Sequence, residues 1–197
     1  MKNADGDDGV WQTVPCKRPG KGHCTTVTKS KPAKGIISQL EVIVTDEDGD
    51  KILDQVKQSK QYINNSLYFN FVSRSISSNL PSEQSFDSII ALGIGSLISP
   101  VSQLQLAIYL CLCDLYLSPT ASNDSKCIFD PIITSVDRKI YDNLGIPVLT
   151  ENTKGKHQVT QGKKVLFFLP HCPYRLYCNI LWANWDNLEN IYLYGNR

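Results

Sequence analysis

The sequence predicts an α/β fold, a three-layer sandwich in which helices cover both faces of a mostly parallel sheet. Two observations carry this prediction. From residue 86 onward, short apolar runs alternate with longer helical patterns, which implies crossover connections between parallel strands. In addition, 42% of the 197 residues are hydrophobic and 20% are charged, a balance expected of a globular core.

The first 35 residues are predicted to form a disordered basic tail, because they are rich in Gly, Lys, Pro and Thr and show no regular period. The stretch KRPGKG within them is either a nuclear-import or nucleic-acid patch or a plain solvated tail, and we favour the latter. The net charge is only +1, so nucleic acid is expected to bind at most weakly, through this tail. No apolar run approaches the roughly 20 residues of a membrane span, so no membrane partner is expected.

Residues 36–85 are predicted to form a helical N-terminal extension. Apolar residues recur at spacings near three and four between Lys51 and Ser78, and Asn64 and Asn65 are expected to divide this stretch into two helices. Just before it, TDEDGDK has the alternating acids of a calcium loop. It has lysine, however, where an EF-hand needs glycine and a second lysine where it needs glutamate. An acidic turn or a helix start is therefore favoured.

Residues 86–197 are predicted to form the α/β domain itself. Its five strands are expected in SIIALGIGS, KCIFDP, IPVLTEN, VLFFLP and NIYLYGN, and its helices in VSQLQLAIYLCLCDLYL, SVDRKIYDNLG and PYRLYCNILWANW. Right-handed crossovers then predict the Rossmann-like strand order 3-2-1-4-5, with a switch point between strands one and four. Ligands of such sheets bind at the carboxyl ends of the strands, near the switch point.

Polar and glycine-rich signals converge on this rim of the predicted sheet. The candidate ligand-binding residues are Gly93, Gly95, Ser96, Asp130, Asn152, His171, Cys172, Asn179 and Asn196. The glycine turn either presents backbone N–H groups to a phosphate or carboxylate or is a plain βα turn, since Ile98 stands where the dinucleotide fingerprint needs glycine. Asp130 either binds a ribose or caps an Asx-type turn before Pro131.

The neighbouring His171 and Cys172 allow several interpretations. A shared zinc ion is not expected, because adjacent side chains of an extended segment point to opposite faces and no partner pair is present. Catalysis by Cys172 would need an activating base, and His157 is the candidate for it. Because His157 lies in a loop of unknown position, we assign no catalytic residue. Cys172 before Pro173 is also a weak signal for a haem-responsive thiolate. The remaining interpretation is that His171 bonds to nearby backbone while Cys172 packs in the core.

Two asparagines follow in the apolar helix after Pro173. Asn179 and Asn184 are expected to be hydrogen-bonded within the fold, because unpaired amides in an apolar helix are costly. The seven cysteines include no C-x-x-C pair, and the acidic first residues do not resemble a signal peptide. Reduced, intracellular thiols are therefore expected.

Several stretches together resemble the SRR-like domain, a family named for the plant protein "sensitivity to red light reduced". They are LGIGSLISPVSQLQLAIYL, FDPIIT, LGIPVLTENTKGKH, LFFLPHCPYRLYCNILWANW and IYLYGN, in this order over about residues 86–196, with WQTVPCKRPGK upstream. The chain departs from the family at Gln103, near the place of an arginine before the Gln-Leu-Ala motif. It also ends Gly-Asn-Arg instead of Gly-Asn-Ser-Phe.

The resemblance implies a regulatory protein of the cytoplasm and nucleus that acts through protein partners or a small ligand. Plant members are linked to circadian-clock input and phytochrome signalling, animal members to clock-gene expression and haem biosynthesis, and fungal members to microtubule-related processes. No reaction comes with the family, so enzymatic activity stays open and we favour a non-enzymatic role. The alternative is a cryptic methyltransferase-like enzyme. Haem and a nucleotide-type ligand are the candidate cofactors.

Overall fold

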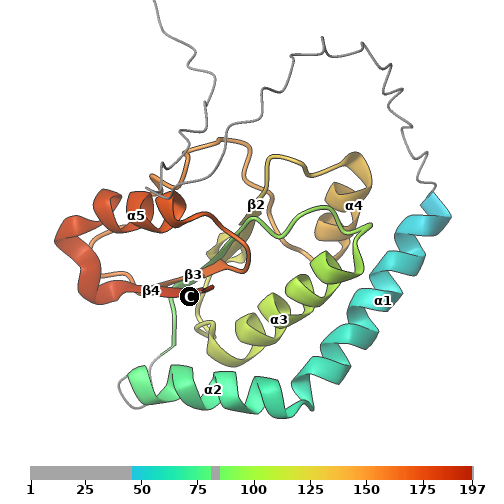
Figure 1. The fold of residues 1–197 in the computed structure, drawn as a ribbon, viewed down its shortest axis with the longest axis horizontal. Helices are drawn as coiled ribbons and strands as arrows, with labels where there is room; N and C mark the ends of the chain where they lie inside the picture. The colour runs from blue at the N-terminus through green and yellow to red at the C-terminus, as the bar shows by residue number, and fades with distance from the viewer. Residues whose placement is uncertain (1–45, 81–84, 197) are drawn as a thin grey trace, which may run out of the picture. The chain divides into compact units, whose positions relative to one another are not determined.

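The structure, a computed structural model, describes residues 46–80 and 85–196 (Figure 1). The predicted basic tail lies outside the described residues. The elements are α1 (Asp46–Asn64), α2 (Leu67–Asn79), β1 (Ser88–Leu92), α3 (Pro100–Tyr116), the 3₁₀ turn η1 (Asn123–Ser125), β2 (Lys126–Phe129), α4 (Ser135–Asn143), β3 (Val165–Leu169), α5 (Tyr174–Ala183), the 3₁₀ turn η2 (Trp185–Asn190) and β4 (Ile191–Gly195). All of them belong to one compact unit.

The sheet contains four strands in the order β2-β1-β3-β4, and each neighbouring pair is parallel. The predicted count of five strands is wrong for the described residues, and the Rossmann-like order is not confirmed. IPVLTEN forms only an isolated bridge, between Ile128 of β2 and Val148. The Pro147 carbonyl and the Leu149 N–H bond to Ile128. Because Pro147 has no N–H to donate, the bridge cannot lengthen toward the start of β2.

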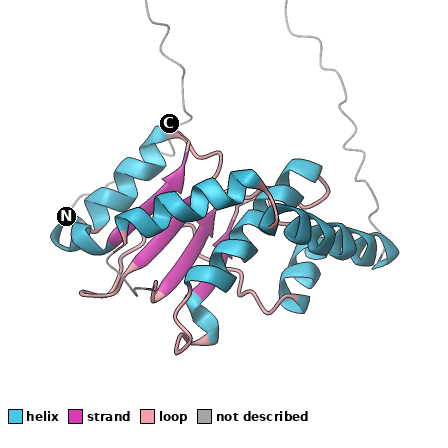
Figure 2. Ribbon diagram, turned by 90° about the horizontal axis from the view of Figure 1, so that it is seen from below, coloured by secondary structure: helices cyan, strands magenta, loops and turns pink. Residues whose placement is uncertain are grey.

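Alternating side chains of the strands build an apolar core on each face of the sheet. Ile89 and Ala91 of β1 pack in the cluster that includes α1, α2, α3 and α4, whereas Ile90 and Leu92 pack in the cluster that includes α5. The same alternation separates Phe168 from Phe167 on β3. Helices therefore cover both faces, as Figure 2 shows, which explains why the central strands are apolar throughout.

Helix α1 packs along the outside of α3, whereas α2 crosses the end of α3 and bonds there to Tyr116 (Figure 1). The two N-terminal helices are separated near Asn64 and Asn65, as predicted, and Ser66 caps the start of α2, where its Oγ accepts from the Phe69 N–H. The acidic stretch starts α1, which confirms the helix-start interpretation. None of the helices in the described ranges has the length and hydropathy that a membrane span requires.

Candidate functional site

A cavity of about 460 Å³ lies at the carboxyl ends of β1, β2 and β3. Its walls come from the turn after β1, the first turns of α3, the turn after β2, residues 149–157 and the turn after β3. Six of the nine predicted site residues line it, namely Gly93, Gly95, Asp130, Asn152, His171 and Cys172. Ser96, Asn179 and Asn196 lie outside the lining. Parallel strands thus bring most of the predicted rim together.

The turn after β1 is closed from within the fold. Gly93 and Gly95 have φ values of +75° and +84°, a region that favours glycine. The Gly93 N–H donates to the Phe129 carbonyl at 3.0 Å, and the Gly95 N–H donates to Asp130 Oδ2 at 2.7 Å. Both N–H groups are therefore already hydrogen-bonded and are not free to hold a phosphate.

Asp130 also forms the turn cap that was one of its two interpretations. Its Oδ1 accepts from the Ile132 N–H at 2.9 Å, which makes an Asx-type turn after β2. The side chain is half-buried and lines the cavity, so its carboxylate still faces the space where a ligand would lie. Each carboxylate oxygen keeps a second lone pair for a further donor.

Ser96 points away from the cavity and toward α4. Its Oγ donates to Asp137 Oδ1 at 3.4 Å, and the Leu97 N–H donates to the same oxygen at 2.8 Å. Asp137 is fully buried and forms a capping box with Thr134. The sequence reasoning passed over Asp137, although the Thr-x-x-Asp spacing before a helix is a capping signal.

Cys172 is a protonated, hydrogen-bonded thiol. The side chain is half-buried, its Sγ donates to the Leu92 carbonyl at 3.2 Å, and burial raises its pKa to about 11. His171 beside it is exposed, and its Nδ1 lies 3.3 Å from Nδ2 of Asn196. Cys172 packs against one apolar cluster but also lines the cavity, so the packing interpretation holds only in part. His171 bonds to the Asn196 side chain, where nearby backbone was expected.

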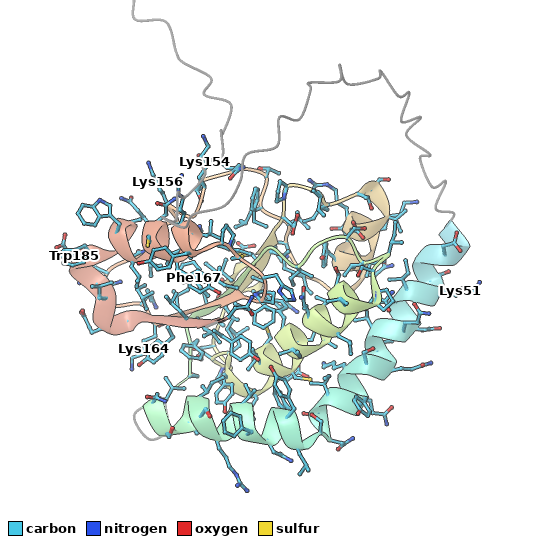
Figure 3. The ribbon with its side chains drawn as sticks, viewed as in Figure 1. Lys51, Lys154, Lys156, Lys164, Phe167 and Trp185 are labelled. Atoms are coloured by element: carbon cyan, nitrogen blue, oxygen red, sulfur yellow. The ribbon has the colours of Figure 1, made fainter. Side chains whose placement is uncertain are left out.

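His157 lines the cavity from the loop that precedes β3. Its ring makes an edge contact with Phe167, whose side chain lies inside the unit in Figure 3. Burial lowers the pKa of His157, which favours the neutral imidazole. Among the described residues, no hydrogen bond joins His157 to Cys172, so the two do not form a nucleophile–base pair.

Asparagines within α5 and directly after it hold this loop in place. Asn179 donates to the Lys154 carbonyl at 2.7 Å, and Asn184 donates to the His157 carbonyl and accepts from the Val159 N–H, both at 2.8 Å. The predicted internal bonding of Asn179 and Asn184 is confirmed. Figure 3 shows Lys154 beside α5, which is the arrangement that these bonds produce.

Two cavity residues that the sequence reasoning missed lie on α3. Ser102 and Gln105 are each only 7% exposed, line the cavity, and have no side-chain hydrogen bond to another described residue. They are three residues apart, so they share one face of the helix. The signal that could have revealed them is a group of polar residues in the first turns of a largely apolar helix, directly after a glycine turn.

The charged groups of the lining are acidic. Asp130 and Glu151 contribute carboxylates, and no Lys or Arg is among the described residues that line the cavity. Gln103, near the place where the family resemblance leads one to expect arginine, is buried and donates through Nε2 to the Leu97 carbonyl at 2.9 Å. The site is thus suited to neutral or cationic groups rather than to anions.

Comparisons with known proteins agree with the resemblance seen in the sequence. The family model of the SRR1 domain matches residues 52–197, which include most of α1 and everything after it. The SRR1-like protein of Mus musculus is 36% identical over 121 residues, covering 59% of this chain and 47% of that protein. Protein SENSITIVITY TO RED LIGHT REDUCED 1 of Arabidopsis thaliana is 39% identical over 75 residues, covering 37% of this chain and 26% of that protein.

The SRR1-like protein of Drosophila melanogaster is 36% identical over 70 residues, which are 34% of this chain and 25% of that protein. The chain therefore spans between about a quarter and about half of the length of these curated relatives. No solved structure matches the chain.

Proposed function

The chain belongs to the SRR1 domain family, and from this membership we propose that it is a regulatory protein that acts through protein partners and a small ligand. The Arabidopsis relative is named for reduced sensitivity to red light, which supports a role in a light or rhythm response. We extend the proposal to circadian-clock input, clock-gene expression and haem biosynthesis, and to the cytoplasm and nucleus. These extensions draw their support from the resemblance in the sequence.

The cavity is the observation that supports a ligand. Its volume of about 460 Å³ falls within the range of about 300–1,000 Å³ that small-molecule sites occupy. It also combines apolar walls, such as Leu92 and Leu176, with a few polar groups, which is the usual composition of such sites. A ligand there would contact the turns after β1, β2 and β3 at once, and it would thereby couple their conformations.

A haem thiolate does not fit the cysteine of this site. A thiolate ligand would require Cys172 to be deprotonated. Its raised pKa favours the thiol, and the thiol S–H donates a hydrogen bond to the Leu92 carbonyl. The proposed link to haem biosynthesis is therefore one of regulation, without haem held by Cys172.

A methyltransferase-like enzyme is the second function proposed for the same cavity. Asp130 after β2 and the turn after β1 support it, because cofactors of open α/β folds bind near such residues. Against it stands the incomplete glycine fingerprint of the turn after β1, where Ile98 takes the place of the third glycine. Regulation through a bound ligand is the function that this site supports best.

The proposed function is tested by blocking the cavity in the organism that carries the protein. Val101 lines the cavity and is 55% exposed, so Val101→Trp should fill the mouth without strain in the core. Leu104→Trp is the matched control, because Leu104 is exposed on the same helix outside the lining. Each variant is expressed in a strain that lacks the protein, and the rhythm of clock-gene transcripts is then measured under red light.

We expect the unmodified chain and Leu104→Trp to restore the rhythm and Val101→Trp to fail. An unchanged rhythm in the strain that lacks the protein would contradict the regulatory role. Equal rescue by the two tryptophan variants would contradict control through the cavity, provided that both proteins accumulate to the same level.

A further inference from the structure

Two of the three buried polar residues of α3 line the cavity and have no side-chain hydrogen bond to another described residue. Gln105 is 7% exposed and lines the cavity, yet neither its amide oxygen nor its amide nitrogen bonds to another described residue. Ser102, one helical turn earlier, is in the same position. Among the described residues, Tyr141 Oη is the buried side-chain polar atom without a partner, so the polar atoms of Ser102 and Gln105 are reached from the cavity. A ligand in the cavity can therefore form hydrogen bonds with them.

The chemistry of Gln105 narrows the class of that ligand. A glutamine amide donates and accepts side by side, and it therefore pairs with a partner that offers an acceptor next to a donor. The edge of a nucleobase has this pattern, and glutamine pairs with adenine through two such bonds. The apolar side chains of Ile94, Phe129 and Leu149 in the lining supply surfaces on which a flat ring can pack.

A second group of the ligand is indicated by Asp130. The carboxylate uses one lone pair on each oxygen, for the N–H groups of Gly95 and Ile132, and it faces the cavity with the others. These can accept from hydroxyl groups, and an acid at the end of the second strand of an open α/β sheet is placed to bond a ribose. A base next to Gln105 and a sugar next to Asp130 together make a nucleoside.

Charge excludes a phosphate from the same ligand. Asp130 and Glu151 are the acidic side chains among the described residues of the lining, and both would disfavour a phosphate. The N–H groups of Gly93 and Gly95, which a phosphate would need, already donate to Phe129 and Asp130. The first turn of α3 also faces the cavity, so a bound phosphate at that helix terminus is the rival outcome to be tested.

We propose that this cavity binds a nucleoside-type ligand without phosphate, either neutral, as adenosine is, or cationic, as S-adenosylmethionine is. Gln105 contacts the base and Asp130 contacts the sugar. The inference rests on the proposed function, because it names the class of ligand through which that function operates.

The test is a calorimetric titration of the full chain with four probes, namely adenosine, S-adenosylmethionine, AMP and ATP. Adenosine, S-adenosylmethionine or both should bind, and AMP and ATP should bind about tenfold more weakly or worse, as two opposing carboxylates require. Equal or tighter binding of AMP or ATP would overturn the proposal, and so would the failure of both phosphate-free probes to bind.

Variants show whether the binding occurs in this cavity. Gln105→Leu keeps the side-chain volume and removes the amide, so it should lower the affinity for the probe by about tenfold or more. Gln158→Leu is the matched control, because Gln158 is exposed and outside this lining, and it should bind as the unmodified chain does. Equal affinities in the two variants would overturn the assignment. The proposed function is tested separately, by the rescue of the rhythm with Val101→Trp and Leu104→Trp. If Val101→Trp fails to rescue while these titrations also fail, the proposed function stands and a ligand of another class occupies the cavity.

Discussion

The backbone N–H of Gly95 donates a hydrogen bond of 2.7 Å to the carboxylate of Asp130, so the residue that follows β2 closes the turn that follows β1. The bond joins two segments that are 35 residues apart in the sequence. It places a negative charge where many open α/β folds hold the phosphate of a ligand. This single contact therefore stabilises the rim and also restricts which ligands the rim accepts.

Asp130→Asn should destabilise the protein by about 1–3 kcal/mol, the usual worth of hydrogen bonds to charged groups. The asparagine oxygen can still accept from the Ile132 N–H, but its NH₂ group cannot accept from the Gly95 N–H. Urea unfolding measures the change. Asp142→Asn is the control, because Asp142 is exposed on α4, and it should change the free energy of unfolding by less than about 0.5 kcal/mol. Equal effects of the two changes would contradict the role given to Asp130.

Gly95→Ala should cost more stability than Gly162→Ala. Both glycines have positive φ, so each alanine incurs about 1–2 kcal/mol of backbone strain. A Cβ at Gly95 would in addition lie 2.8 Å from Ser102 Oγ, whereas nothing lies within 4 Å of one at Gly162. Thermal unfolding of the two variants measures the difference.

The same clash can be relieved by a second change. Ser102→Ala removes the Oγ and leaves a Cβ at 3.9 Å, so the double variant Gly95→Ala/Ser102→Ala should be about as stable as Gly162→Ala. A double variant that is less stable than Gly95→Ala alone would show that Ser102 is not the obstacle.

Tyr177→Phe should loosen the carboxyl end of β4. The Tyr177 hydroxyl donates to the Leu169 carbonyl at 2.8 Å and accepts from the Asn196 N–H at 3.0 Å, so it ties the ends of β3 and β4 to α5. Its removal should cost about 1–2 kcal/mol and speed the exchange of the Asn196 amide hydrogen. Tyr62→Phe, at an exposed tyrosine of α1, should change neither quantity. Unchanged exchange at Asn196 in Tyr177→Phe would count against this tie.

His157 should make the folded protein less stable in mild acid. Burial lowers its pKa from the ordinary value of 6.5, so the imidazole is neutral in both the folded and the unfolded chain at higher pH. As the pH falls below about 6.5, the unfolded chain takes up the proton first, and the free energy of unfolding decreases until the folded pKa is passed.

His157→Phe should remove this part of the pH dependence while keeping the ring contact with Phe167. The measurement is the difference in melting temperature between pH 7.5 and pH 5 for the unmodified chain, His157→Phe and the neighbouring control Gln158→Phe. The control should retain the full difference. A difference that persists in His157→Phe would assign the acid sensitivity to another group.

The sequence predicted the elements and much of the rim for clear physical reasons. Apolar runs of strand length predicted β1 through β4, and parallel strands bring their carboxyl ends together, so Gly93 and Asp130 were expected side by side. The fifth strand was wrong because Pro147 interrupts the ladder beside β2, a local signal that the apolar pattern of IPVLTEN obscured.

By itself the sequence determined the alternation of helices and strands, the family and the segments that meet at the rim, because these follow from periodicity and from motifs along the chain. Only the tertiary structure decided which side chains face the cavity. Ser96 turns to Asp137, Asn179 turns to the loop, and Gln105 faces the cavity without a partner. The rotation of a helix about its axis and the path of a loop are set by packing between distant segments, which no local pattern records.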